Sequence, residues 1–268
     1  MRRRRFVAGL VVCAATVTVV ACGDRAAPAL ETSDASAGSV AVSAGAPATS
    51  ASAPSRDLGP VGPTAVAAHG YVPGLARSTG SEGAVTYDVQ VPTLTGGNAA
   101  AAERFTASMR ASLADRVRTL GPAPKPITVT DGRVASGERS RVSRIGAKAV
   151  GGVLLTNYFM QGAAHPNNQI GTVVINTGTA QPILLSDVLP TAKAIAGVKD
   201  LIRRQVTEAG PTPSLNEATT LANWLPTAAG ITFYVPVAHA AGDFWPFALP
   251  WRDLDGIVPA EVIALLRA

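Results

Sequence analysis

Two short loops carry the polar side chains that could bind or transform a ligand, one at residues 162–168 and one at residues 239–243. The side chains concerned are His165, Asn167 and Asn168 in the first loop and His239 and Asp243 in the second. Imidazole, amide and carboxylate groups supply hydrogen-bond donors and acceptors to a ligand. If the two loops lie at the same end of a sheet, His239 approaches His165. We therefore expect these loops to form the contact end of a binding site.

The same side chains could also be assembled into a metal site or a hydrolase. His165 and His239 with Asp187 or Asp243 would supply metal ligands, but no spacing in the chain matches a zinc signature. Ser186, His165 and Asp243 could be drawn as a catalytic triad, but the chain has no Gly-x-Ser-x-Gly elbow to expose a serine. We expect no metal, no cofactor and no catalytic residue. A cell-wall or ester hydrolase that uses His165 is the alternative hypothesis, and a histidine that only fixes its own loop is another.

Two tyrosines are further candidates for ligand contact. Tyr158 lies in an apolar stretch that leads into the first loop. Tyr234 has the opposite parity to Phe233 and so falls on the other face of an expected strand at 231–237. The large apolar residues that alternate along 245–251 are expected to be core, whereas Tyr234 is expected at the surface. A surface tyrosine can stack on a sugar ring or anchor an interface.

The first 21 residues, 1–21, have the regions of a lipoprotein signal peptide. Arg2 to Arg5 are basic, residues 6–20 are apolar, and the Val-Val-Ala-Cys sequence that ends at Cys22 matches a lipobox. An apolar run this short is typical of a signal peptide rather than a membrane span. We expect Cys22 to be acylated, with palmitate as a lipid, and the protein to be held on the extracytoplasmic face of the cell membrane. An ordinary secretory signal with a chance cysteine is the alternative.

Residues 22–65 are rich in Ala, Ser, Gly and Pro and show no hydrophobic period, which predicts a flexible tether. Residues 66–268 are numerous enough for one domain with a sizeable core. Four of the 23 Lys and Arg lie in the expected signal peptide, which leaves 19 against 18 Asp and Glu. This balance removes the argument for nucleic-acid binding, which needs a basic surface. Cys22 is the one cysteine outside the signal, so we expect no disulfide.

The 66–268 segment mixes strand and helix patterns without repeated strand-helix-strand units. This predicts a single α+β domain, in which an antiparallel or mixed β-sheet is packed by two main amphipathic helices. Strand patterns occupy residues 85–91, 127–134, 150–161, 170–176, 231–237 and 245–251. The two main helices are expected at 99–120, with Asn98 as its N-cap, and at 194–206, and a short helix at 259–266.

Three local features accompany these elements. Pro92 is expected to end the first strand, and residues 66–81 have no decisive pattern. Residues 182–189 are expected to add a third strand to a β-meander that starts at 150–161. Residues 136–145 hold Arg139, Arg141 and Arg144 and are expected to form a solvated edge or loop.

Six short motifs occur at and around the two loops. They are Asn157-Tyr158-Phe159-Met160-Gln161-Gly162-Ala163-Ala164-His165, Thr177-Gly178, Leu185-Ser186-Asp187-Val188-Leu189, Gly230-Ile231-Thr232-Phe233-Tyr234-Val235, Ala240-Ala241-Gly242 and Phe247-Ala248-Leu249-Pro250-Trp251. Together they resemble the extracytoplasmic domain of RsiV-type anti-sigma factors, a domain of unknown function that also occurs in PdaC-type peptidoglycan deacetylases and in secreted actinobacterial immunogenic antigens. Ala163 stands where that family usually has a second glycine, and an alanine there matters if the position needs a positive φ.

The resemblance implies recognition rather than catalysis, because the RsiV-type module binds lysozyme. An RsiV-type protein needs a cytoplasmic segment to hold a sigma factor, and five residues precede the apolar run here. A PdaC-type enzyme carries its chemistry in a separate deacetylase domain, which we do not expect in this chain. We therefore expect a stand-alone module that binds a lysozyme-like protein or an envelope component such as a glycan. An antigen-like surface protein that acts on host partners is a further alternative.

Overall fold

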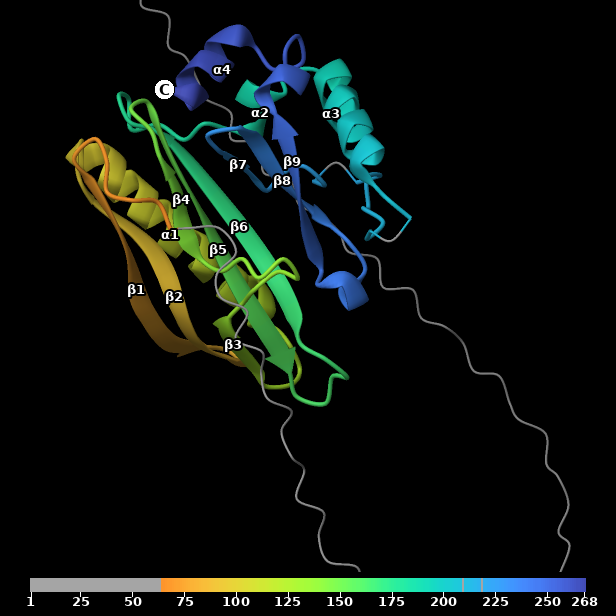
Figure 1. The fold of residues 1–268 in the computed structure, drawn as a ribbon. Helices are drawn as coiled ribbons and strands as arrows, with labels where there is room; N and C mark the ends of the chain where they lie inside the picture. The colour runs from red at the N-terminus through yellow and green to blue at the C-terminus, as the bar shows by residue number, and fades with distance from the viewer. Residues whose placement is uncertain (1–63, 209, 218) are drawn as a thin grey trace, which may run out of the picture. The chain divides into compact units, whose positions relative to one another are not determined.

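The computed structural model describes residues 64–208, 210–217 and 219–268. These residues belong to one compact unit and form an α+β fold, as expected. The strands make a mixed six-stranded sheet and a separate antiparallel three-stranded sheet (Figure 1). The predicted signal peptide, Cys22 and nearly all of the predicted tether lie outside the described residues. Within the described part, no helix is long and apolar enough to cross a membrane.

The large sheet begins with a hairpin of β1 (Tyr71–Glu82) and β2 (Val85–Gly96). The predicted alternation in β2 is confirmed, because its odd-numbered residues from Val85 to Val91 face the core. The prediction that Pro92 ends this strand is wrong. The parallel neighbour β3 (Ile127–Asp131) pairs only with residues 85–88, so the missing N–H of Pro92 removes no bond from that ladder.

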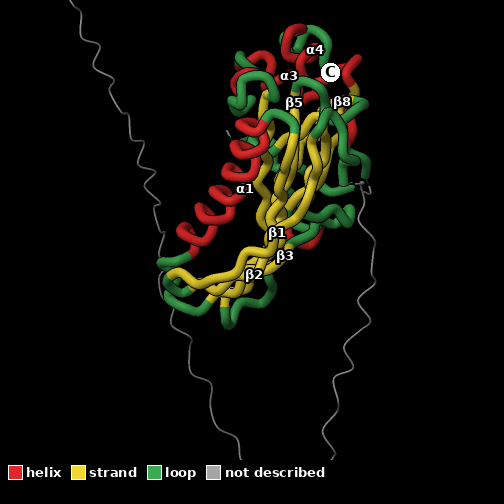
Figure 2. Tube along the Cα trace, turned by 90° about the vertical axis from the view of Figure 1, so that its left-hand side faces the viewer, coloured by secondary structure: helices red, strands yellow, loops and turns green. Residues whose placement is uncertain are grey.

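The helix α1 (Ala99–Leu120) has the bounds that the sequence predicts. Asn98 is its N-cap, since the side-chain oxygen accepts a hydrogen bond of 3.1 Å from the N–H of Ala100. The predicted apolar stripe is buried against one face of the large sheet, along which α1 runs in Figure 2. The amide of Asn98 also donates to the carbonyl oxygen of Thr177 at 2.8 Å, which ties the start of the helix to the turn at Thr177-Gly178.

The strand β5 (Ala149–Met160) is the centre of the large sheet. Antiparallel neighbours are β3 and β4 (Arg141–Ile145) along one edge and β6 (Asn167–Asn176) along the other. Both faces of β5 are buried, as its apolar sequence predicts, and successive residues belong to two different core clusters. Gly152 allows α1 to approach closely, because a Cβ there would lie 2.6 Å from the Cζ of Phe105.

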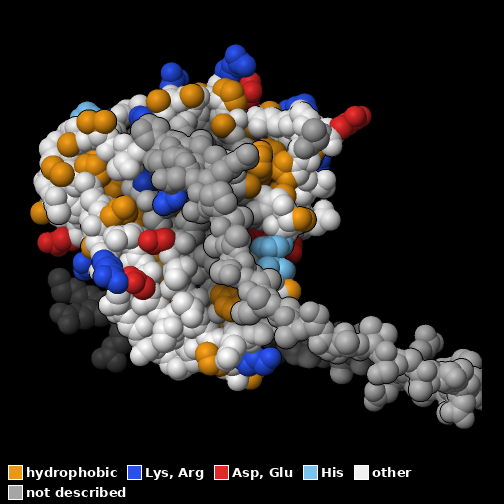
Figure 3. Space-filling view, turned by 60° about the horizontal axis from the view of Figure 1, so that its bottom comes forward, with side chains coloured by type: hydrophobic (Ala, Val, Ile, Leu, Met, Phe, Trp, Pro, Cys, Tyr) orange, Lys and Arg blue, Asp and Glu red, His pale blue; other side chains and the backbone are white. Residues whose placement is uncertain are grey.

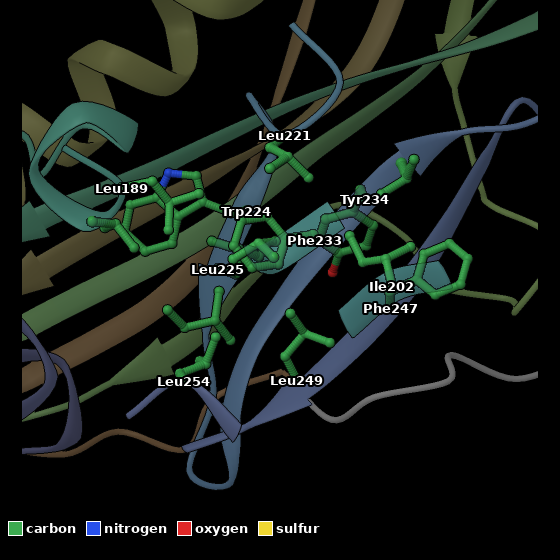
Figure 4. Close-up of a cluster of buried hydrophobic side chains, with 14 of the residues drawn as sticks. Leu189, Ile202, Leu221, Trp224, Leu225, Phe233, Tyr234, Phe247, Leu249 and Leu254 are labelled. Atoms are coloured by element: carbon green, nitrogen blue, oxygen red, sulfur yellow. The ribbon is translucent and has the colours of Figure 1, made fainter. Parts of the chain in front are cut away.

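The small sheet consists of β7 (Trp224–Pro226), β8 (Gly230–Pro236) and β9 (Phe244–Pro250). Its apolar side chains form one cluster with residues of β5 and β6 and with α3 (Ala192–Gln205) and α4 (Ala260–Arg267), and part of this cluster is drawn in Figure 4. The two predicted strands and both predicted helices are confirmed here. The large sheet is therefore covered by α1 on one face and by the small sheet on the other.

The prediction of a third strand at 182–189 is wrong. After β6 the chain makes a turn and one isolated bridge between Ile175 and Pro182, and then forms a single helical turn, α2 (Leu185–Val188). Asp187 accounts for the difference, because its carboxylate accepts a hydrogen bond of 2.8 Å from the N–H of Leu184 and so caps the start of that turn.

The arginines before and in β4 divide into exposed and buried ones. Arg139 is exposed, as expected. The side chain of Arg141 is only 11% exposed and forms an ion pair of 2.9 Å with Glu138, so the prediction of a solvated edge is wrong for this residue. Arg144 is half-buried and donates to the carbonyl oxygen of Arg267 at 2.8 Å, beside the C-terminal end of α4.

Candidate functional site

The two candidate loops meet, and their histidine rings stack. The ring centroids of His165 and His239 lie 3.6 Å apart with an angle of 13° between the ring planes. His165 lies in the loop that joins β5 to β6, and His239 begins the short 3-10 helix η1 (His239–Ala241) that joins β8 to β9. Both residues are exposed, and Figure 3 shows histidine surface beside acidic atoms on this side of the molecule. The two hairpins therefore present one joint surface.

One carboxylate holds the two loops together. Asp243 Oδ1 lies 2.8 Å from Nδ1 of His239, and Asp243 Oδ2 accepts a hydrogen bond of 2.7 Å from the backbone N–H of Asn168. The amide of Asn168 also donates to the same Oδ2 at 3.2 Å. The Asp243 side chain is only 14% exposed, so these contacts are shielded from bulk water. We call this set of His165, Asn168, His239 and Asp243 the loop clasp.

The backbone at Gly242 and Asp243 has an unusual conformation. Gly242 has φ 97° and Asp243 has φ 70°, which is the left-handed region that favours glycine and tolerates aspartate. Gly242 also packs closely, since a Cβ there would lie 2.9 Å from the Cβ of Ala135. Glycine is therefore required at the third position of the Ala240-Ala241-Gly242 motif both for its conformation and for space.

The hydrogen-bond pattern occupies one nitrogen of each ring. Nδ1 of His239 faces the Asp243 carboxylate, and Nδ1 of His165 lies 3.2 Å from the carbonyl oxygen of Pro166. An oxygen acceptor therefore faces each Nδ1, which leaves each Nε2 without a partner in these contacts. The stacked pair thus has two Nε2 atoms for a ligand, on rings whose orientation is already set.

The loop around Ala163 needs no glycine at that position. Gly162 has φ 83°, whereas Ala163 does not have a positive φ, and its N–H donates to the carbonyl oxygen of Met160 at 2.9 Å. An alanine at this position therefore imposes no backbone strain on the loop.

The two candidate tyrosines do not join the clasp. Tyr158 is half-buried in the core cluster on the α1 side of the large sheet. Tyr234 is 1% exposed, so the prediction that it lies at the surface is wrong. Its hydroxyl donates to Glu138 at 2.5 Å, and the same carboxylate oxygen binds Arg141. Burial, followed by the charge of Glu138, raises the pKa of Tyr234 well above its ordinary value.

The other amide candidates lie beside the clasp at the start of β6. Asn167 is half-buried and pairs with Tyr158 across the ladder. Asn157 was not a candidate from the sequence, yet its amide donates to the side-chain oxygen of Asn168 at 3.2 Å. The one signal for Asn157 is its place next to Tyr158, in a strand whose other residues up to Leu155 are apolar. It extends the polar surface from the clasp onto the large sheet.

The structure does not assemble Ser186, His165 and Asp243 into a catalytic triad. Ser186 lies in α2, and Asp243 contacts His239 rather than His165. Within residues 64–208, 210–217 and 219–268, no hydroxyl group is hydrogen-bonded to either ring of the stacked pair. The same residues contain no group of three or more His, Cys, Asp or Glu that could hold a metal ion.

Comparisons with solved structures find likenesses to this fold, among them two proteins of one family. No protein-family model matches the chain, and no curated protein matches it. A solved structure of a DUF3298 family member from Bacteroides fragilis is 12% identical and has a TM-score of 0.48, covering 74% of this chain and 96% of that one. A DUF3298 family protein from Pseudomonas aeruginosa PAO1 is 14% identical with a TM-score of 0.44, covering 72% of this chain and 95% of that one. The chain is thus similar to proteins of a family that is itself named as a domain of unknown function.

Proposed function

We propose that this chain is a non-catalytic binding module of the cell envelope and that the loop clasp is its contact surface. The observation that carries the proposal is the stacked, exposed pair of His165 and His239, held by the mostly buried Asp243 carboxylate. A surface whose side chains are already oriented loses less conformational entropy when it binds a partner. The pair therefore has the properties of a preorganised recognition site.

The proposal includes attachment to the membrane. The lipobox at Cys22 supports a lipid anchor on the extracytoplasmic face, and residues 23–65 supply a tether between the anchor and the folded part. The partner is a lysozyme-like protein or an envelope component, which is what the motif resemblance implies. An exposed clasp on a tethered module is suited to reach such a partner.

A hydrolase is the second candidate, because one observation favours it. The contact of 2.8 Å between His239 and Asp243 has the form of the base and orienting carboxylate in a catalytic triad. In this reading His239, not His165, is the general base, and the nucleophile is an activated water. Turnover of p-nitrophenyl acetate that is lost in His239→Ala and kept in His165→Ala would favour the hydrolase.

The binding proposal is tested by pull-down of the tagged chain with lysozyme and with purified envelope glycans as separate baits. We expect saturable binding to one bait, and loss of that binding in the His165→Ala, His239→Ala double variant. His69→Ala is the matched control, because His69 is exposed and lies before β1, away from the clasp in the sequence. Binding that survives in the double variant, or that His69→Ala also abolishes, would refute the clasp as contact surface.

A further inference from the structure

A row of polar side chains crosses three strands of the large sheet next to the loop clasp. Thr130 of β3 pairs with Asn157 of β5, and Asn157 pairs with Asn168 of β6. Directly paired residues of neighbouring antiparallel strands point to the same face of a sheet. The row therefore presents one hydroxyl and two amides side by side. Leu155, two residues before Asn157 in β5, lies on the same face and is buried, so the row marks the point where this face changes from core to polar surface.

Two cations border this row. Thr130, Asn157 and Asn168 line a pocket of about 410 Å³ together with Arg133 and Arg139 from the segment that joins β3 to β4. Asp131 also lines the pocket, but its carboxylate accepts a hydrogen bond of 2.7 Å from the N–H of Gln90. The two guanidinium groups therefore lie beside one engaged carboxylate at the border of the pocket.

The guanidinium of Arg133 is available to a ligand. Within the described parts of the chain, it has no hydrogen-bond or ion-pair partner. Arg133 is exposed, so an anion can reach it without a change of fold. Guanidinium groups bind carboxylates through paired hydrogen bonds and are the preferred partners for such planar anions.

An apolar ring lies on the same face. Phe159 follows Asn157 by two residues in β5, which places both side chains on one side of the sheet, and Phe159 is 42% exposed. Amides and hydroxyls match the hydroxyl groups of a sugar, while an exposed aromatic ring can cover its apolar C–H face. The guanidinium of Arg133 adds a partner for a carboxylate.

From this arrangement we infer that the pocket binds a carboxylate-bearing sugar, such as one unit of an acidic glycan. The inference rests on the proposed function, since Asn168 belongs both to the loop clasp and to the pocket. The carboxylate contacts Arg133, and the hydroxyl groups contact the row of Thr130, Asn157 and Asn168. The clasp then contacts the neighbouring part of the same chain of sugars.

The test uses saturation-transfer NMR on the full chain, with D-glucuronate as the probe and D-glucose and acetate as comparison ligands. We expect a saturable signal from glucuronate and at least about tenfold weaker binding of glucose, because glucose lacks the carboxylate that forms charged hydrogen bonds with a guanidinium group. We also expect acetate to bind more weakly than glucuronate. The Arg133→Gln variant should reduce glucuronate binding at least about tenfold, whereas Arg252→Gln at an exposed position outside the pocket should not change it.

Each of three outcomes would overturn the inference. They are no saturable glucuronate signal, equal binding of glucose and glucuronate, and undiminished binding in Arg133→Gln with unchanged circular dichroism. If acetate binds as tightly as glucuronate, the pocket recognises only the carboxylate, and the inference that it binds a sugar is overturned. The pull-down with the histidine variants is separate. If the partner is still lost in those variants while glucuronate fails to bind, the ligand class is wrong and the binding-module proposal stands.

Discussion

Replacing Asp243 tests whether the loop clasp is a built structural unit. The carboxylate accepts hydrogen bonds from the N–H and the amide of Asn168 and contacts Nδ1 of His239. Asp243→Ala removes all of these contacts and also places an alanine at φ 70°. Asp243→Asn keeps an oxygen that can accept the bond from the Asn168 N–H and tolerates the left-handed conformation. Asp243→Gly removes the contacts but relieves the backbone.

The expected order of destabilisation follows from these three changes. A hydrogen bond to a charged group contributes about 1.5–3 kcal/mol and a neutral one about half of that, so Asp243→Asn should cost about 1 kcal/mol. Asp243→Ala loses the charged bonds and adds a cost of about 1 kcal/mol for the left-handed backbone, which gives about 2.5–4 kcal/mol in total. Asp243→Gly should fall between the two, because it avoids the backbone cost.

The assay is urea unfolding at neutral pH, followed by circular dichroism, with all variants measured at one protein concentration. Asp255→Ala is a control, because Asp255 is exposed and lies outside the clasp. We expect Asp255→Ala to change the free energy of unfolding by less than about 0.5 kcal/mol. If Asp243→Ala also costs less than about 0.5 kcal/mol, or if Asp243→Gly is more harmful than Asp243→Ala, the clasp does not hold the loops as described.

Three further predictions concern the fold around the site. Gly152→Ala should destabilise the protein by about 1–3 kcal/mol in thermal unfolding, because the new Cβ would lie 2.6 Å from Phe105, whereas Gly178→Ala meets nothing closer than 3.4 Å and should cost clearly less. Asn98→Ala should cost about 1 kcal/mol in urea unfolding through loss of the N-cap, and a change of less than about 0.3 kcal/mol would contradict the role of the cap. The raised pKa of Tyr234 means that the folded state holds the phenol proton more tightly than the unfolded chain, so this contribution is present below about pH 10 and is lost as pH rises further. The stability advantage of the wild type over Tyr234→Phe should therefore shrink between about pH 8 and about pH 10.5 in urea unfolding, and an advantage that grows over that interval would contradict the assignment.

The sequence was most informative where one local pattern decides the structure. The bounds of α1 follow from Asn98 as a cap, an uninterrupted apolar stripe and the Gly121-Pro122 pair after it. The central place of β5 follows from a run that is apolar on both parities. The sequence predicts that His165 and His239 approach each other only if their two loops lie at the same end of the fold. Each loop joins two strands of a predicted hairpin, and no local pattern says how the two hairpins are placed relative to each other.

The failures come from contacts that no local pattern encodes. Tyr234 alternates with Phe233 and its position in the pattern predicts a surface residue. In the structure Glu138, before β4, and Arg141, in β4, cover that face of β8. The strand β1 has many exposed residues and no apolar period, so its pairing with β2 defines it as a strand. The pocket beside the clasp joins side chains of β3, β5 and β6 with the segment after β3, and only the sheet order brings them together.

The central claim is that the loop clasp is the contact surface, and an affinity comparison tests it most directly. The measurement is a titration of the bait that the pull-down identifies against the wild type, His165→Ala, His239→Ala and the double variant, with His69→Ala as control. We predict that the double variant binds at least about tenfold more weakly while keeping the circular dichroism of the wild type, and that His69→Ala binds as the wild type does. Equal affinity of the wild type and the double variant would contradict the claim.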